Sequence, residues 1–212
     1  MNEPLEQSNS DMSYIPEIGY YDGRESPPDR HTQATFMALV DAMIPQSPEL
    51  AEEYGRIQFY GAIDLYIDEY MIMSLDNAAV PLAAPAAELL DVAAEELIAA
   101  GGNQGSLDFS RYPGGGTFSA LTAEDRFRAI TLLMQPNINQ ELLPVPFRNN
   151  VALEQSTVGT IIRLVFMGYY SEWSGYGSTR LSPPGERVLE EFPVSWKQVG
   201  YPGPSLGYRV LF

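Results

Sequence analysis

The sequence predicts an all-α protein, a compact helical domain of about five helices followed by an irregular C-terminal tail rich in aromatic, Pro and Gly residues. Apolar residues recur at steps of three and four in five segments, which is the spacing of one helix face. No segment shows the alternating pattern of a strand bounded by hairpin turns. From residue 168 onward, nine aromatic residues and twelve Gly or Pro disfavour long helices.

The 212 residues divide into an N-terminal arm (residues 1–31), a helical core domain (32–170) and an extended C-terminal tail (171–212). The arm is polar, acidic and rich in turn-forming residues, and it carries no helical periodicity. A chain of this length is long enough for one sizeable domain with an extension.

The first helix is expected to begin at Thr32 as its N-cap and to stop at Pro45. Its buried face holds Phe36, Leu39, Val40 and Met43. A second helix is expected from about residue 51 to residue 75, because apolar residues hold one face over that length.

A third helix follows Pro85 and ends at Gly101, since glycine supplies the left-handed residue common at helix ends. After a turn-rich loop, the fourth helix has Thr122 as its N-cap and Pro136 as its stop. We expect four of its residues to be buried: Phe127, Ile130, Leu133 and Met134.

The last helix of the domain, residues 151–170, is apolar on most of its circumference. Such a helix is typically buried at the centre of a fold. We therefore expect Ile161 and Phe166, on opposite sides of this helix, both to be buried. In the tail, only residues 183–192 have a helical pattern.

The composition excludes several classes of partner and site. Twenty-eight acidic residues against twelve basic ones give a net charge of −16, which argues against nucleic acid or anionic lipid as a partner. The absence of cysteine excludes disulfides and thiolate metal sites. No apolar run is long enough to span a bilayer, and no export signal is recognisable. We expect a cytoplasmic protein, or an extracytoplasmic one if it is exported with a partner.

Few residues suggest catalysis. The single histidine, His31, is expected to be a capping or surface residue, because no nucleophile or metal-ligand pattern accompanies it. Acid pairs such as Asp64 with Asp68, or Glu95 with Glu96, have the residue types of glycosidase carboxylates. Pairs of this kind are inevitable among 28 acids, so we predict no catalytic, cofactor-binding or metal residue in this chain. An independent helical enzyme acting on carbohydrates through acidic residues is the alternative.

The tail has the composition of a partner-binding segment. Tyr and Trp supply large contact areas at low entropy cost, and prolines reduce the ordering penalty. The predicted partner-binding residues are Tyr169, Tyr170, Trp173, Trp196, Tyr201, Pro202, Pro204, Tyr208 and Phe212. In the alternative arrangement, Trp196 and Tyr201 pack on the chain's own helices.

Five stretches, in order, resemble the gluconate 2-dehydrogenase subunit 3 family, the small or gamma subunits of flavin-dependent sugar and sugar-acid dehydrogenases. The resemblance covers roughly residues 32–210. The stretches are ATFMALVDAMIP (34–45), GAIDLYIDEY (61–70), LTAEDRFRAI (121–130), GYY (168–170) and VGYPGPSLGY (199–208). The stretches follow one another in the same order as in that family.

The resemblance implies a non-catalytic subunit that matures and stabilises a larger oxidoreductase of the glucose-methanol-choline type. FAD and hydride abstraction would belong to that partner, and a cytochrome or other electron acceptor is a further candidate partner. Members of the family often carry a twin-arginine signal, which this sequence lacks before residue 32. A stand-alone, chaperone-like binding protein is the remaining alternative.

Overall fold

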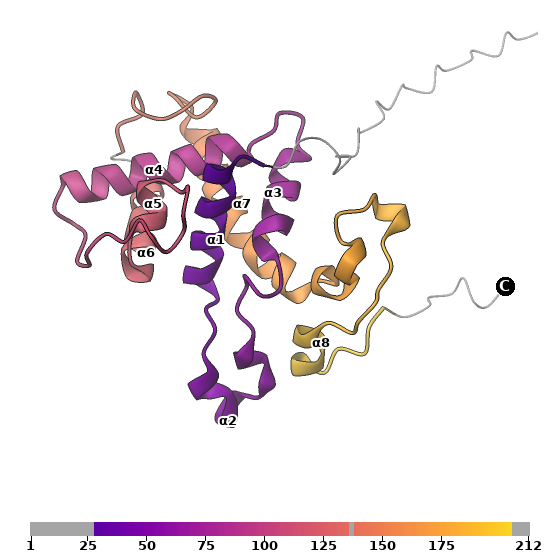
Figure 1. Cartoon of the computed structure of the whole chain (residues 1–212). Helices are drawn as coiled ribbons and strands as arrows, with labels where there is room; N and C mark the ends of the chain where they lie inside the picture. The colour runs from indigo at the N-terminus through magenta and orange to yellow at the C-terminus, as the bar shows by residue number, and fades with distance from the viewer. Residues whose placement is uncertain (1–27, 136–137, 205–212) are drawn as a thin grey trace, which may run out of the picture.

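The computed structural model of the chain describes residues 28–135 and 138–204, and these residues form helices and loops with no strand (Figure 1). Five α-helices have ten or more residues: α1 (Arg30–Met43), α3 (Ile67–Asp76), α4 (Ala83–Ala99), α6 (Ala123–Leu133) and α7 (Val151–Tyr170). The short ones are α2 (Ala51–Tyr54), α5 (Thr117–Ala120) and α8 (Val194–Val199). Four 3₁₀ segments join them: η1 (Pro48–Leu50), η2 (Arg56–Phe59), η3 (Trp173–Thr179) and η4 (Pro184–Glu186). The all-α prediction is confirmed, with three short helices beyond the expected five.

The five longer helices enclose one hydrophobic core. Helix α1 packs against α3, α4 and α6, and α3 packs in turn against α7 (Figure 1). Each of these helices places fully buried side chains in the core, among them Phe36, Ile67, Leu89, Leu133 and Val165. Burial of one such side chain typically contributes about 1.5–3 kcal/mol.

Side-chain caps start three of the helices. Helix α1 begins earlier than predicted because Asp29, not Thr32, is its N-cap and accepts from the Thr32 backbone N–H at 2.9 Å. Thr122 caps α6 as predicted, accepting from the Asp125 backbone N–H at 3.3 Å. Asn150 does the same for α7.

The predicted helix over residues 51–75 is wrong, because the chain turns twice within that range. Gly55 has φ of 89°, a left-handed conformation that ends α2. At Gly61 a Cβ atom would lie 2.9 Å from the backbone nitrogen of Gln46, so only glycine allows this close approach. Asp64 holds the turn by accepting from the Gly61 N–H at 2.8 Å. Helix α3 therefore starts only at Ile67.

Three residues that we expected to be buried are exposed. Phe127 on α6 and Met134, the C-cap residue of that helix, are 45% and 59% exposed, and Phe166 on α7 is 46% exposed. Ile130 and Leu133 on α6 and Ile161 on α7 are buried as predicted. Both helices lie at the edge of the described fold, so each has one face without a neighbouring helix.

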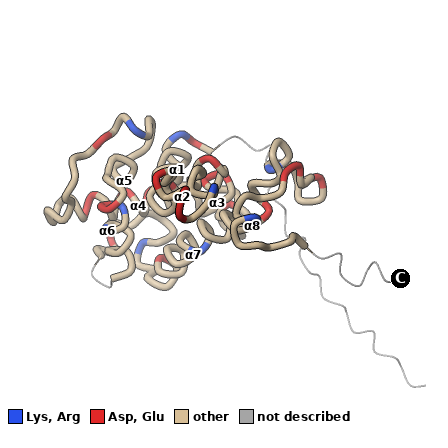
Figure 2. Tube along the Cα trace, turned by 90° about the horizontal axis from the view of Figure 1, so that it is seen from below, with Lys and Arg blue, Asp and Glu red and all other residues tan. Residues whose placement is uncertain are grey.

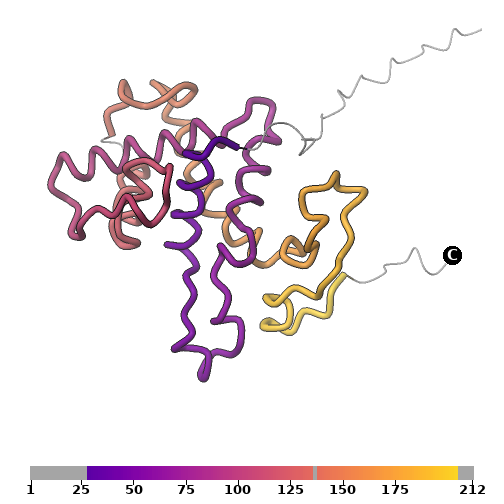
Figure 3. The backbone as a smooth tube through the Cα atoms, in the orientation of Figure 1, coloured from indigo at the N-terminus to yellow at the C-terminus, as the bar shows by residue number. Residues whose placement is uncertain are grey.

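The described part of the tail, residues 171–204, folds back on the chain's own helices instead of extending away (Figure 3). The Trp173 ring belongs to the hydrophobic core, and its Nε1 donates to the Tyr66 carbonyl at 2.8 Å. The Arg180 guanidinium makes a bidentate ion pair with the Glu69 carboxylate of α3: Nε donates to Oε2 at 2.6 Å and Nη2 to Oε1 at 3.1 Å. The core therefore continues past residue 170.

Within the tail, the helices lie elsewhere than predicted. Of residues 183–192, only Pro184–Glu186 form a helical turn, and α8 follows Pro193 in a segment for which we predicted no helix. Pro193 has a fixed φ that suits the residue just before a helix. The first 27 residues of the predicted arm lie outside the described residues.

Candidate partner-binding surface

Exposed side chains, all but one of them aromatic, lie on three parts of the chain that contact one another: the segment around α2 and η2, the C-terminal end of α7, and α8 with the residues after it. We call this the aromatic surface. Its members are between 37% and 59% exposed, and they are Tyr54, Phe59, Tyr60, Tyr170, Val199 and Tyr201.

Trp196 of α8 holds the C-terminal side of this surface together. Its ring is only 4% exposed, and its Nε1 donates to the Tyr170 carbonyl at 2.8 Å. Gly200 adopts φ of 69° and turns the chain back, so that Tyr201 meets the Trp196 ring edge-to-face with centroids 4.9 Å apart. Aromatic pairs of this geometry add about 0.5–1.5 kcal/mol beyond the area that they bury.

Two contacts join the α2–η2 segment to the C-terminal half. The Gln198 side-chain amide donates to the Tyr54 carbonyl at 2.7 Å. Gly55 lies against the same amide, where a Cβ atom would come within 3.0 Å of the Gln198 Oε1. The Tyr169 hydroxyl donates to the Tyr60 carbonyl at 3.4 Å, a longer and weaker bond. The surface is thus assembled from residues more than 100 positions apart.

Tyr169, whose hydroxyl contacts the Tyr60 carbonyl of this surface, is a neutral group. Burial raises the pKa of Tyr169 to about 12, with a smaller contribution from the charge of Tyr170. Its hydroxyl therefore stays protonated at neutral pH and can donate to Tyr60. Exposed Tyr and Phe side chains over a buried Trp have the composition of protein–protein contact surfaces, which are enriched in aromatic residues.

The structure separates the predicted partner-binding residues into three groups. Trp173, Trp196 and Tyr169 are buried against the chain's own helices, contrary to their prediction as partner-binding residues. Trp173 belongs to the core, while Trp196 and Tyr169 donate to carbonyl groups of the aromatic surface. The four exposed residues are Tyr170, Tyr201, Pro202 and Pro204. Tyr208 and Phe212 lie outside the described residues.

The sequence pattern placed Tyr54, Phe59 and Tyr60 within one long helix over residues 51–75 and did not indicate that they are exposed. Their exposure follows from the turns at Gly55 and Gly61, which interrupt that helix. Those two glycines, six residues apart in an otherwise helical pattern, were the available signal.

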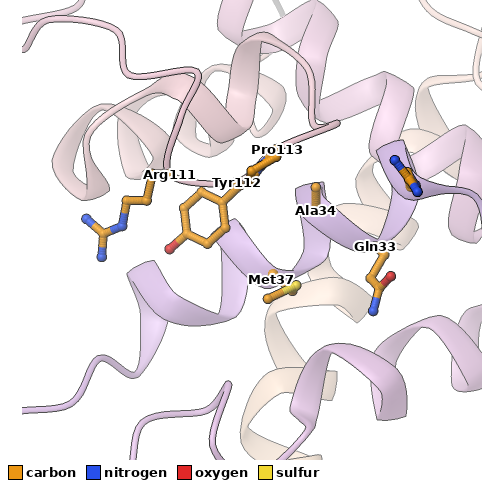
Figure 4. A pocket seen from close by; sticks show the side chains of 7 residues that line it. Gln33, Ala34, Met37, Arg111, Tyr112 and Pro113 are labelled. Carbon is orange, nitrogen blue, oxygen red and sulfur yellow. The ribbon is translucent and has the colours of Figure 1, made fainter.

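A second candidate is a surface pocket of about 280 Å³ between α1 and residues 111–113. In Figure 4, Gln33 and Met37 of α1 lie on one side of it, and Arg111 and Tyr112 on the other. The Arg111 guanidinium pairs with Asp41 at 2.7 Å, and the Tyr112 hydroxyl donates to the same carboxylate. The polar groups of this wall are therefore occupied by the chain's own Asp41.

Of the acidic and histidine candidates, His31 and Asp64 make contacts that serve local structure. His31 pairs with Asp91, and Asp91 also accepts from the Phe118 backbone N–H at 2.8 Å. Asp64 holds the turn before α3, and Asp68 is 5% exposed at the start of that helix. In residues 28–135 and 138–204, no three His, Cys, Asp or Glu side chains are grouped so that they could hold a metal ion.

Within the same described ranges, no helix is both long enough and apolar enough to cross a membrane. A comparison of the chain with protein-family models, with curated proteins and with solved structures finds no match.

Proposed function

We propose that this chain is a non-catalytic subunit that binds a larger protein through the aromatic surface. The observation that carries this proposal is the surface itself, where four tyrosines and one phenylalanine stand exposed on a base built around the buried Trp196. Such side chains are enriched at interfaces, where they make large contacts at low entropy cost.

The proposed partner is the FAD-containing catalytic subunit of a glucose-methanol-choline-type oxidoreductase that acts on a sugar, polyol or sugar acid. Support comes from the stretches that resemble the gluconate 2-dehydrogenase subunit 3 family. Three of the five contribute to the aromatic surface or adjoin it: residues 61–70 follow Tyr60, residues 168–170 include Tyr170, and residues 199–208 begin with Val199. The partner would hold FAD and abstract the hydride, while this chain would bind and stabilise the partner.

The test is co-expression with a glucose-methanol-choline-type flavoprotein from the same source. We expect a complex that elutes as one species and absorbs at the flavin wavelength. Tyr201→Ala or Tyr60→Ala should each weaken the complex by about 2–4 kcal/mol, roughly 30- to 900-fold in Kd. Phe109→Ala is the matched control, because Phe109 is 60% exposed outside the aromatic surface.

The outcomes separate the two parts of the proposal. A complex that tolerates both tyrosine variants as well as it tolerates Phe109→Ala would show that the partner uses another face. Failure of the flavoprotein to associate at micromolar concentration would exclude it as the partner.

A further inference from the structure

The outer face of α7 carries a seam of residues that follow one another at alternating steps of four and three. The seam consists of Ala152, Ser156, Gly159, Arg163, Phe166 and Tyr170. This spacing keeps side chains on one stripe of a helix and is the spacing by which helices pair. Five of the six residues are exposed and Gly159 is half-buried, while α3, α6, η3 and α8 pack against other sides of α7.

The seam carries no carboxylate. Helix α7 has two charged residues in twenty, and of these Glu154 is only 1% exposed, which leaves Arg163 as the charge on the outer face. The tube of α7 is accordingly tan over most of its length (Figure 2). In a chain of net charge −16, most faces repel a second copy. The face of α7 lets a second copy approach without opposing carboxylates.

The packing of its own chain does not require a glycine at position 159. A Cβ atom there would meet only the Arg163 Nη2, at 3.7 Å. Gly168 of the same helix differs, because its Cβ would lie 2.6 Å from the Tyr70 ring. A glycine within a helix costs about 0.5–1 kcal/mol relative to alanine. Its place at the middle of an exposed seam fits a site where a second molecule comes close.

We propose that α7 pairs antiparallel with α7 of a second copy. The two-fold axis crosses the seam midway between Gly159 and Arg163, at the level of residue 161 along the helix. In this register Gly159 faces Arg163 of the second copy, Ser156 faces Phe166, and Ala152 faces Tyr170. Each layer thus sets a small residue against a large one, as a well-packed isologous contact requires. Parallel pairing would instead place Arg163 against Arg163 and Gly159 against Gly159.

This proposal goes beyond the proposed function, since it needs no other protein. Tyr170 belongs to both the seam and the aromatic surface. The remaining seam residues are on the part of α7 that precedes it. Gly159→Leu changes the seam alone, and Tyr60→Ala and Tyr201→Ala change the aromatic surface alone, so these variants test the two interfaces separately.

The absence of native cysteine permits a direct test of the register. Ala152 and Tyr170 lie about 27 Å apart along one helix, at 1.5 Å per residue, so they cannot form a disulfide within a chain. The double variant A152C/Y170C should oxidise to a covalent dimer of about 47 kDa, twice 23.5 kDa. The single variant A152C should stay uncrosslinked, because antiparallel pairing keeps its two thiols far apart.

Sedimentation velocity on the unmodified chain provides the second readout, with a species of about 47 kDa, twice 23.5 kDa, expected at tens of micromolar. Gly159→Leu should convert it to a monomer with unchanged helical circular dichroism, since the outer side of that residue is open. Gly185→Leu is the control and should remain dimeric, because Gly185 is equally open but lies in η4. A monomeric unmodified chain, an uncrosslinked double variant, a crosslinked A152C or a dimeric Gly159→Leu would each overturn the proposal.

Discussion

Asp68 is a buried carboxyl group whose environment opposes its charge. It lies in the first turn of α3 and is 5% exposed. Burial raises the pKa of Asp68 to about 6, and the charge of Glu69 adds to the rise. Backbone hydrogen bonds and the Arg180 guanidinium act in the opposite direction but do not cancel it. The charged form of Asp68 is therefore less favourable in the folded chain than in the unfolded one.

Asp68→Asn is expected to stabilise the chain at neutral pH. The pKa of Asp68 in the folded chain is above the ordinary value of 3.8. The free energy of unfolding therefore falls as the pH rises from about 4 to about 6, and it stays lowered at higher pH. Removing the charge should add about 2–3 kcal/mol at pH 7.5, roughly 5–10 °C in Tm, and little at pH 4. Thermal melts at both pH values measure this, with Glu88→Gln on the exposed face of α4 as the control. An equal gain at pH 4 would assign the effect to something other than this titration.

At the scale of single elements, helix α6 tests which predicted face is buried. Ile130 is 5% exposed and Phe127 is 45% exposed, although the sequence pattern assigned both to the core. Ile130→Ala should lower the free energy of unfolding by about 2–4 kcal/mol, because it leaves a cavity. Phe127→Ala should cost less than about 1 kcal/mol. Urea unfolding of the two variants compares them directly, and a larger loss for Phe127→Ala would mean that the exposed face of α6 is covered.

The elements that were predicted well are those specified by local chemistry. Helix α7 has the predicted bounds. Thr122 caps α6 by a hydrogen bond to Asp125, only three positions further along the chain. The helix predicted over residues 51–75 failed because its interruption depends on distant atoms. Gly55 has to make room for Gln198, and Gly61 for Gln46. A periodicity of apolar residues carries no information about such contacts.

At the scale of the whole molecule, the tail completes the fold of the chain that precedes it. Trp173 is part of the core, Arg180 pairs with α3, and Trp196 supports the aromatic surface. The sequence indicated that aromatic residues of the tail form contacts. It could not indicate which of them face inward, because inward packing depends on carbonyl groups of Tyr66 and Tyr170 that only the folded chain brings near.

Two truncations should therefore differ. A chain ending at Val194 loses Trp196 and α8 but keeps Trp173, so it should remain folded and helical while its aromatic surface comes apart. A chain ending at Ser171 also loses Trp173, whose removal from the core should cost about 3–5 kcal/mol and deplete the folded state. Circular dichroism melts and gel filtration of both products check this. Equal stability of the two would contradict the assignment of Trp173 to the core.

The long separation between the halves of the aromatic surface also has a consequence for synthesis. The hydrogen bond from Gln198 to Tyr54 joins residues 144 positions apart, and the one from Trp173 to Tyr66 joins residues 107 positions apart. At about 5–20 residues per second, a ribosome makes Tyr54 roughly 7–30 s before Gln198. During that interval the nascent chain has only half of the surface and nothing to fix it. A partner that requires both halves would thus recognise only chains whose translation has passed the last of these contacts, so premature termination products would be left out of assembly.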